Sequence, residues 1–356
     1  MDDYKKQIDE LLSVTAQRGG SDLHLSPGHY PMVRIDGRLT PLTDHKILEK
    51  DLLNNLILAI LEGGRKEKFL AEKEMDFAYE LDKQARFRVN IYQTRSDFAA
   101  TFRLIPEVIR TLDELNLPPI IKIFSKLSQG FVLVVGPNGH GKSTTLAAII
   151  DQINHERNEK IVTIEDPIEY IFSPDQSIID QRELYEDTLS FGRALRSTFR
   201  ENVNVIMVGE MRDYETVSAA VTAAETGHLV FASLHTNNAA QTVERIIDVF
   251  PPAQQREIIS QLANSISGVI SMRLVPRIQG GLVPAVEVMI ANTAVRNLIR
   301  EGRAQQLNLA IDTGSDVGMI SLNRSLADLV RRKEISIEQA EFYSLNPAEL
   351  RELIKI

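Results

Sequence analysis

The strongest constraint on this chain is an apolar stretch that runs directly into a glycine-rich loop, with a helical pattern behind it. Residues 131–145 read Phe-Val-Leu-Val-Val-Gly-Pro-Asn-Gly-His-Gly-Lys-Ser-Thr-Thr, which matches the phosphate-loop pattern GxxxxGK[ST]. The glycines let backbone N–H groups turn toward phosphate oxygens, and the next helix directs its positive dipole end at the same anion. The alternative is a chance glycine-rich turn, which the flanking strand and helix patterns disfavour.

This loop predicts a bound nucleoside triphosphate at one end of a strand. Lys142 is expected to reach the β- and γ-phosphates, and the Ser143 hydroxyl is expected to ligate Mg²⁺. The residues expected to contact the nucleotide in this segment are Gly136, Pro137, Asn138, Gly139, His140, Gly141, Lys142, Ser143 and Thr144.

The composition is typical of a globular protein and favours a cytoplasmic location. The 356 residues suffice for two or three domains, and none is cysteine, which suits a reducing compartment. The net charge of −9 argues against a broad nucleic-acid surface. No apolar run approaches the length of a membrane span, and the polar N-terminus lacks the apolar core of a signal peptide.

The periodicity along the chain predicts two domains joined by a linker. Residues 1–105 are expected to form an α+β domain with an antiparallel sheet. Residues 106–119 are expected to form a linker, because their prolines limit regular secondary structure. The expected N-terminal elements are a helix over 4–18, a hairpin turn at Asp36-Gly37, a broken helical stretch over 48–72, and strands over 75–81, 85–93 and 98–105.

The character of the sequence changes from about residue 120. Apolar strands alternate with helices, which predicts a parallel sheet covered on both faces. The expected strands are 131–135, 161–164, 205–209 and 229–234. Residues 253–356 are expected to be mostly helical, with a short strand near 283–290.

Carboxylates follow two of these strands. Glu165, Asp166 and Glu169 come just after one, and Glu210 follows Gly209 at the end of another. Ligands of open α/β sheets bind at the carboxyl ends of strands, so these acids are candidates for polarising water or supporting Mg²⁺. A solvated acidic turn is the alternative for the first cluster.

Histidines and arginines supply further candidates. His228 and His235 bracket an apolar strand. One interpretation is that these histidines sense the nucleotide state, and the other is that they make only structural hydrogen bonds. Arg193, Arg196 and Arg200 are expected to share one face of a helix that starts at Asp187-Thr188. Arg88 and Arg103 of the N-terminal domain suit phosphate recognition, although surface ion pairs explain any single arginine equally well.

These segments together resemble the type II and type IV secretion ATPases, and within them the pilus retraction (PilT) family. The resemblance rests on the phosphate loop, Glu165 to Glu169, Val208 to Asp213, and the histidine-bracketed strand. Residues 294–301, Ala-Val-Arg-Asn-Leu-Ile-Arg-Glu, are similar to a segment typical of the retraction branch. His140 departs from the family, which usually has serine there.

The resemblance implies a homohexameric ring in which a PAS-like N-terminal domain precedes a RecA-like ATPase domain, with ATP bound between them. It implies that Glu169 polarises water and Glu210 supports Mg²⁺, with Glu165, His235 and Arg200 as further catalytic candidates. His228, Arg88 and Arg103 are expected to help bind the nucleotide. The resemblance also implies the cytoplasmic face of the inner membrane, peripheral association through the pilus machine, and as partners its platform protein and other pilus motor ATPases.

Three other functions share parts of this pattern. An accessory retraction motor or an extension or secretion ATPase of the same superfamily would share these motifs. A nucleic-acid translocase is disfavoured by the acidic charge and the few aromatic residues. A regulatory switch that binds ATP without turnover is disfavoured by the intact Lys142, Glu169 and Glu210.

Overall fold

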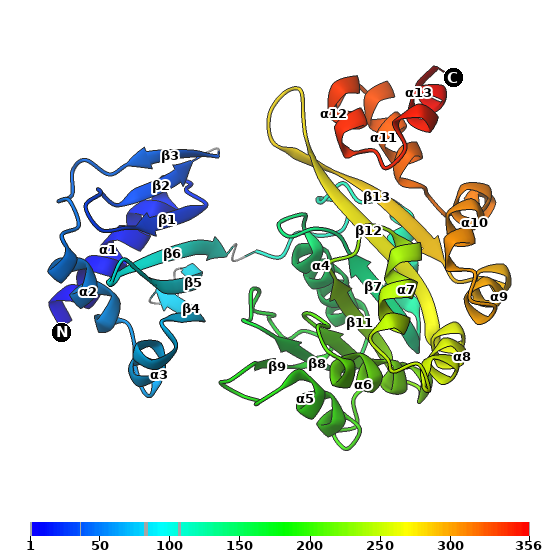
Figure 1. Cartoon of the computed structure of the whole chain (residues 1–356), viewed down its shortest axis with the longest axis horizontal. Helices are drawn as coiled ribbons and strands as arrows, with labels where there is room; N and C mark the ends of the chain where they lie inside the picture. The colour runs from blue at the N-terminus through cyan, green and yellow to red at the C-terminus, as the bar shows by residue number, and fades with distance from the viewer. Residues whose placement is uncertain (1, 36, 82–84, 106–107, 356) are drawn as a thin grey trace. The chain divides into compact units, whose positions relative to one another are not determined.

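The computed structural model describes residues 2–35, 37–81, 85–105 and 108–355, which form two compact units (Figure 1). The first unit comprises Met1–Val108 and Pro167–Ile171, and the second comprises Ile109–Asp166 and Phe172–Ile356. The predicted turn residue Asp36 and positions 106–107 of the predicted linker lie outside the described residues. Of the rest of that segment, Val108 belongs to the first unit, and residues 109–119 belong to the second and bury Leu112 and Leu117.

The first unit is an antiparallel sheet packed with helices. The strands run in the order β3-β2-β1-β6-β5-β4. Phe87, Val89 and Ile91 alternate along β5 and are fully buried, because successive side chains of a strand point to opposite faces. The elements are α1 (Asp2–Gln17), β1 (Asp22–Leu25), β2 (Met32–Ile35), β3 (Arg38–Pro41), α2 (Lys50–Ala59), α3 (Arg65–Glu72), β4 (Glu74–Leu81), β5 (Ala85–Thr94) and β6 (Asp97–Ile105).

The second unit is built on a seven-stranded sheet in the order β13-β12-β7-β11-β10-β8-β9. All neighbouring pairs are parallel except β12 with β13. The first half contains η1 (Pro119–Lys126), β7 (Gly130–Val135), α4 (Lys142–Glu156), β8 (Lys160–Glu165), β9 (Ile178–Glu183), α5 (Phe191–Thr198), β10 (Val205–Val208), α6 (Tyr214–Glu225) and β11 (Leu229–Leu234).

The second half of this unit completes the sheet and adds the C-terminal helices. It contains α7 (Ala239–Asp248), α8 (Gln255–Ser265), β12 (Ile266–Pro276), β13 (Leu282–Ile290), α9 (Thr293–Arg300), η2 (Ala304–Gln306), α10 (Leu307–Thr313), η3 (Ser315–Val317), α11 (Leu322–Arg331), α12 (Ile337–Tyr343) and α13 (Pro347–Lys355). The mixed α/β fold class predicted from the sequence is confirmed.

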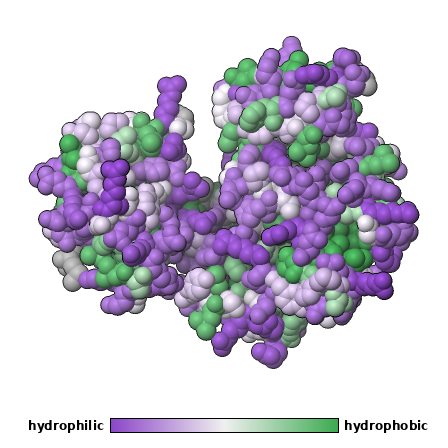
Figure 2. Space-filling view, viewed as in Figure 1, coloured by the Kyte–Doolittle hydropathy of each residue, from purple (hydrophilic) through white to green (hydrophobic). Residues whose placement is uncertain are grey.

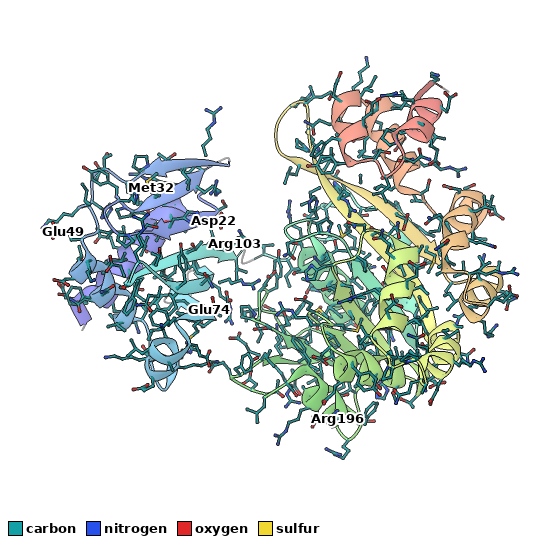
Figure 3. The ribbon with its side chains drawn as sticks, in the orientation of Figure 1. Asp22, Met32, Glu49, Glu74, Arg103 and Arg196 are labelled. Carbon is teal, nitrogen blue, oxygen red and sulfur yellow. The ribbon has the colours of Figure 1, made fainter. Side chains whose placement is uncertain are left out.

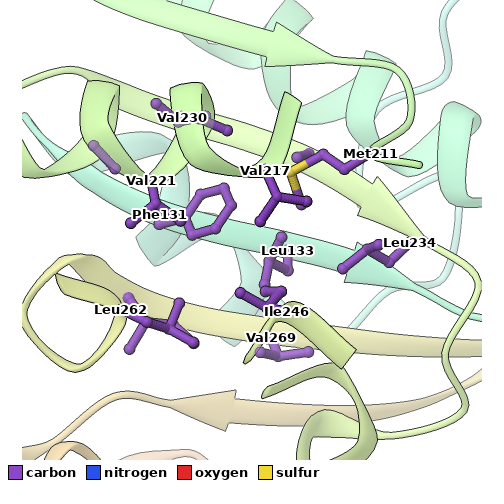
Figure 4. Close-up of a cluster of buried hydrophobic side chains, with 14 of the residues drawn as sticks. Phe131, Leu133, Met211, Val217, Val221, Val230, Leu234, Ile246, Leu262 and Val269 are labelled. Carbon is purple, nitrogen blue, oxygen red and sulfur yellow. The ribbon is translucent and has the colours of Figure 1, made fainter. Parts of the chain in front are cut away.

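The central strands are apolar on both faces because helices cover both. Phe131 and Leu133 of β7 join one large cluster with residues of α5 to α9, such as Val217 and Ile246 (Figure 4). The alternate position Val132 is also fully buried, on the opposite face. A strand buried on both sides reads as a continuous apolar run, which explains why these strands were recognisable in the sequence.

Two local predictions are wrong. The region after residue 253 holds not only helices and the strand at 282–290 but also the long strand β12, which lies inside the sheet next to β7. The helix expected from Asp187 begins at Phe191, where the Ser190 side chain accepts the N–H of Arg193 as the N-cap. It ends at Thr198, so Arg200 lies beyond it and the three arginines do not share one helix face.

The surfaces are mainly hydrophilic, with apolar patches between charged areas (Figure 2). One group of exposed apolar side chains lies at α12, where Phe342 is 80% exposed. Within the described part of the chain, none of the helices is both long enough and apolar enough to pass through a bilayer.

Candidate functional site

Neighbouring strands bring the predicted site together. In a parallel sheet the carboxyl ends of all strands lie at one edge. β7, β11 and β10 are adjacent, so the phosphate loop after Val135, His235 after Leu234, and Glu210 near Val208 meet at that edge. These segments are about a hundred residues apart at most, and only the strand order places them side by side.

The phosphate loop needs its glycines for conformation and for space. Gly136 has φ +144°, and a Cβ there would lie 2.6 Å from the carbonyl oxygen of Met272 in β12. Gly139 and Gly141 also have positive φ values, +76° and +86°, which favour glycine. The helix α4 then begins at Lys142, so its N-terminal end follows directly on the loop.

Lys142 lies folded over this loop and is 8% exposed. Its Nζ donates to the carbonyl oxygens of Gly136 at 2.9 Å and Pro137 at 3.0 Å. The same Nζ lies 3.3 Å from Nδ1 of His235. The ammonium group therefore connects the phosphate loop to the residue that follows β11.

His235 continues this chain of contacts to Glu210. Its Nε2 lies 2.6 Å from Oε1 of Glu210, and Arg212 places its Nη2 2.7 Å from Oε2 of the same carboxylate. Burial raises the pKa of Glu210, but the hydrogen bonds and charges of Arg212 and His235 outweigh burial, so the pKa lies below its usual value. Glu210 is therefore a carboxylate at neutral pH.

Arg212 belongs to the segment Val208 to Asp213 but is not among the predicted site residues. Its position two residues after Glu210 is the only signal for it in the sequence. The hydrogen bond to Glu210 raises the pKa of Arg212, and the nearby charge of Asp166 acts in the same direction. The structure thus adds a second cation, besides Lys142, to the predicted group.

Glu165 is placed at the end of β8 and is only 7% exposed. Its Oε1 accepts the hydroxyl of Thr163 at 2.7 Å and the side-chain amide of Gln181 at 3.3 Å. These hydrogen bonds tie Glu165 to β8 and β9. Asp166 belongs to the second unit like Glu165, whereas Glu169, the third acid of this segment, belongs to the first unit.

Within the first unit, Glu169 and the two predicted arginines make ion pairs. Nη1 of Arg88 lies 3.3 Å from Oε1 of Glu169. Arg103 faces Asp22 (Figure 3), and its Nε donates to Asp22 Oδ1 at 2.9 Å. Burial raises the pKa of Asp22, but hydrogen bonds from Ser21 and Arg103 outweigh it and lower that pKa. Both arginines therefore already pair with carboxylates.

The structure separates His228 from the phosphate loop. His228 precedes β11, at the opposite end of that strand from His235, which at ~3.3 Å per residue is about 20 Å away. Its Nδ1 lies 3.0 Å from the carbonyl oxygen of Ala223, and its ring packs on Phe199. His228 therefore lies far from the phosphate loop of its own chain, and its part in binding the nucleotide stays a prediction.

The arginines near α5 are exposed. Arg196 forms an ion pair with Glu215 at 3.3 Å and projects at the surface (Figure 3). Arg200 follows the end of α5 in a turn. Neither comes close to the phosphate loop through any contact that the structure records, and a role for Arg200 stays a prediction.

A small cavity of about 70 Å³ lies beside the phosphate loop. It is lined on one side by Gly141 and Thr144, and on the other by residues of the segment 109–119 and of β12. The residues from that segment are Arg110, Leu115 and Leu117, and Leu274 is one of those from β12.

The oxygen ligands available for a metal are few. Among the described residues, no cluster of three or more histidine, aspartate and glutamate side chains has the geometry to hold a metal ion. The exposed hydroxyl of Ser143 and the carboxylate of Glu210 are oxygen donors, the kind that Mg²⁺ prefers when substrate phosphates and water complete its shell.

The retraction-like segment forms the helix α9, which Asn292 caps. Val295 and Ile299 are fully buried, as expected from their spacing. Arg296 donates to the carbonyl oxygen of Ala263 at 2.8 Å, at the end of α8. The segment therefore packs as an amphipathic helix against α8.

Comparison with known proteins gives consistent matches along nearly the whole chain. Residues 4–302 match the family described as type II/IV secretion system protein. The chain is 45% identical to the type IV pilus retraction ATPase PilT of Pseudomonas aeruginosa over 333 residues, which is 94% of this chain and 96% of that protein. It is also 45% identical to a twitching motility protein of Neisseria gonorrhoeae, over 87% of this chain and 83% of that protein.

A solved structure has the same fold. The crystal structure of the pilus retraction motor PilT with bound ADP superposes with a TM-score of 0.89 at 42% identity, covering 97% of this chain and 99% of that one. The similarity extends over both units of the chain.

Proposed function

The chain belongs to the type II/IV secretion system protein family, and on that basis we propose that it is an ATPase motor that retracts type IV pili. The observation that carries the proposal is the chain of contacts from Lys142 through His235 to Glu210 and Arg212, at the edge of the sheet that holds the phosphate loop. This arrangement joins a phosphate-binding cation to an ionised acid.

The phosphate loop supplies binding. Backbone N–H groups of the loop and of the start of α4 face the phosphates, and the dipole of α4 favours the negative charge. When the nucleotide binds, the Nζ of Lys142 moves from the carbonyl oxygens of Gly136 and Pro137 to the β- and γ-phosphates. The side chain of His235 moves with it, because Nδ1 of His235 contacts this Nζ.

The acids prepare the reaction. Glu169 polarises the attacking water, and Glu210, which Arg212 holds ionised, would help to hold the metal ion. Ser143 would hold Mg²⁺ together with the phosphates, and the ion would supply positive charge to the phosphate oxygens when bound. Loss of the γ-phosphate changes what Lys142 and His235 contact, and this change starts the movement of the motor.

The assembly that we propose is a homohexameric ring on the cytoplasmic face of the inner membrane. The ring acts on the platform protein of the pilus machine and works beside other pilus motor ATPases. Arg200, Arg88 and Arg103 are candidates for contacts across a subunit boundary.

The test is phosphate release by the purified protein with ATP and Mg²⁺. We expect steady release that falls at least about 100-fold in Lys142→Ala, because the γ-phosphate loses its cation. Lys46→Ala is the control, since Lys46 is exposed and makes no ion pair among the described residues. Absence of release from the wild-type protein would contradict the ATPase and favour a regulatory switch.

A cellular test separates the motor classes. Deletion of the gene is expected to give hyperpiliated cells that do not twitch, and complementation with Lys142→Ala is expected to leave them so. Bald cells would identify an extension motor. Tight, salt-sensitive DNA binding that stimulates turnover would identify a translocase.

A further inference from the structure

The phosphate loop carries a histidine, His140, whose side chain the proposed mechanism does not use. Its Nδ1 accepts the backbone N–H of Leu274 in β12 at 2.8 Å. Its ring also packs edge-on against Tyr343 of α12, with ring centroids 6.2 Å apart. One side chain therefore joins the loop to a neighbouring strand and to a C-terminal helix.

The N–H of Leu274 needs this acceptor because of the sheet register. The last pair between β12 and β7 is Ser271 with Val135, so Leu274 lies beyond the end of β7. On its other side Leu274 faces Pro284 of β13, which has no N–H. Such a pair does not exchange hydrogen bonds, so the N–H of Leu274 points toward the phosphate loop. If β7 were longer, its next residue would accept this N–H; since β7 has ended, Nδ1 of His140 accepts it instead.

This hydrogen bond sets the charge of the ring. An imidazole accepts at Nδ1 only when the ring is neutral with its hydrogen on Nε2, because an imidazolium donates from both nitrogens. Burial lowers the pKa of His140, and the positive charges of Arg273 in β12 and Lys142 in α4 lower it further. Tyr343 is the titratable side chain that faces it from α12.

We propose that neutral His140 is a positioning residue, which pins the phosphate loop to β12 through the N–H of Leu274, and that protonation of its ring releases the loop and weakens nucleotide binding. This inference rests on the proposed nucleotide-binding function. It gives the C-terminal helix α12, with its exposed Phe342, a direct contact to the loop through Tyr343.

The test is the dissociation constant of ADP with Mg²⁺, measured by titration calorimetry from pH 8 downward. The variants are His140→Asn, whose Oδ1 accepts at a position similar to Nδ1 but does not titrate, and His140→Ala, which leaves the N–H unpaired. At pH 8 we expect the asparagine variant to bind like the wild type and the alanine variant about fivefold more weakly. As the pH falls, the wild type is expected to approach the alanine variant, while the asparagine variant does not.

His155→Asn is the matched control. His155 is an exposed residue near the other end of α4, about 20 Å from the loop at 1.5 Å per residue, and the change should leave the pH profile as in the wild type. Protonation of ADP itself affects all variants equally and cancels in their ratios.

Three results would decide against the inference. Equal affinity of the alanine variant and the wild type at pH 8 would show that the hydrogen bond does not position the loop. Parallel pH profiles of the wild type and the asparagine variant would exclude the role of protonation. Tighter binding by the wild type than by the asparagine variant at low pH would mean that the imidazolium attracts the phosphates instead. Failure of the wild type to bind ADP at any pH would contradict the proposed function itself.

Discussion

A buried carboxyl group in the sheet of the second unit gives the sharpest stability prediction. Glu287 of β13 is 6% exposed, and its Oε1 accepts the N–H of Ala239 at 2.8 Å, at the start of α7. Burial raises its pKa from 4.5 to about 7, and the charge of Asp312 acts in the same direction. The hydrogen bond from Ala239 and the charge of Arg273 oppose the shift but do not cancel it.

This shift destabilises the fold as the pH rises. Between pH 4.5 and about 7 the unfolded chain has lost the proton of Glu287 while the folded chain retains it. Stability falls with pH wherever the unfolded state binds fewer protons, so the loss begins near pH 4.5 and is complete above about 7. A shift of about 2.5 pH units at 1.36 kcal/mol per unit corresponds to about 3 kcal/mol.

The perturbation is Glu287→Gln, which keeps an acceptor for Ala239 and removes the titration. Urea unfolding is measured from pH 5 to pH 8 at one protein concentration, because an oligomer's stability depends on concentration. The variant should match the wild type within about 1 kcal/mol at pH 5 and exceed it by about 3 kcal/mol at pH 8.

The control is Glu257→Gln on α8, which is exposed and should change stability by less than about 0.5 kcal/mol at either pH. The reasoning is refuted if the glutamine variant follows the pH dependence of the wild type. It is also refuted if the variant is less stable at pH 8, since the ionised carboxylate would then be stabilised by Arg273 and the start of α7.

Two further predictions test the loop and a helix end. Gly136→Ala puts a Cβ 2.6 Å from the carbonyl oxygen of Met272 at φ +144°, so strain of about 1–3 kcal/mol should weaken ADP binding about tenfold by calorimetry. Gly64→Ala, which meets open space, should not change it. Asn292→Ala removes the acceptor for the N–H of Val295 at the start of α9 and should lower the free energy of unfolding by about 1 kcal/mol. Asn292→Ser keeps an acceptor at this N-cap and should therefore retain most of the stability that Asn292→Ala loses.

Elements with an unambiguous local pattern were predictable. The strand before the phosphate loop, the loop glycines and the start of α4 follow from one stretch of sequence, because apolar runs and positive-φ positions leave clear marks. The long strand β12 was missed because a buried strand and a buried helix segment look alike as short apolar runs. The start of α5 was misplaced because Asp187 and Ser190 are both acceptable N-caps, and only the folded chain shows that Ser190 accepts the N–H.

The sequence by itself determined which residue types are available for phosphate chemistry and at which strand ends they lie. That information is local, since a phosphate loop is read from consecutive residues. The tertiary structure decided which of them meet. Placing β7, β11 and β10 side by side brings Lys142, His235 and Glu210 into contact and leaves His228 at the far end of its strand. It also turned His140 toward Leu274, because the partner of that N–H depends on where β7 ends beside β12.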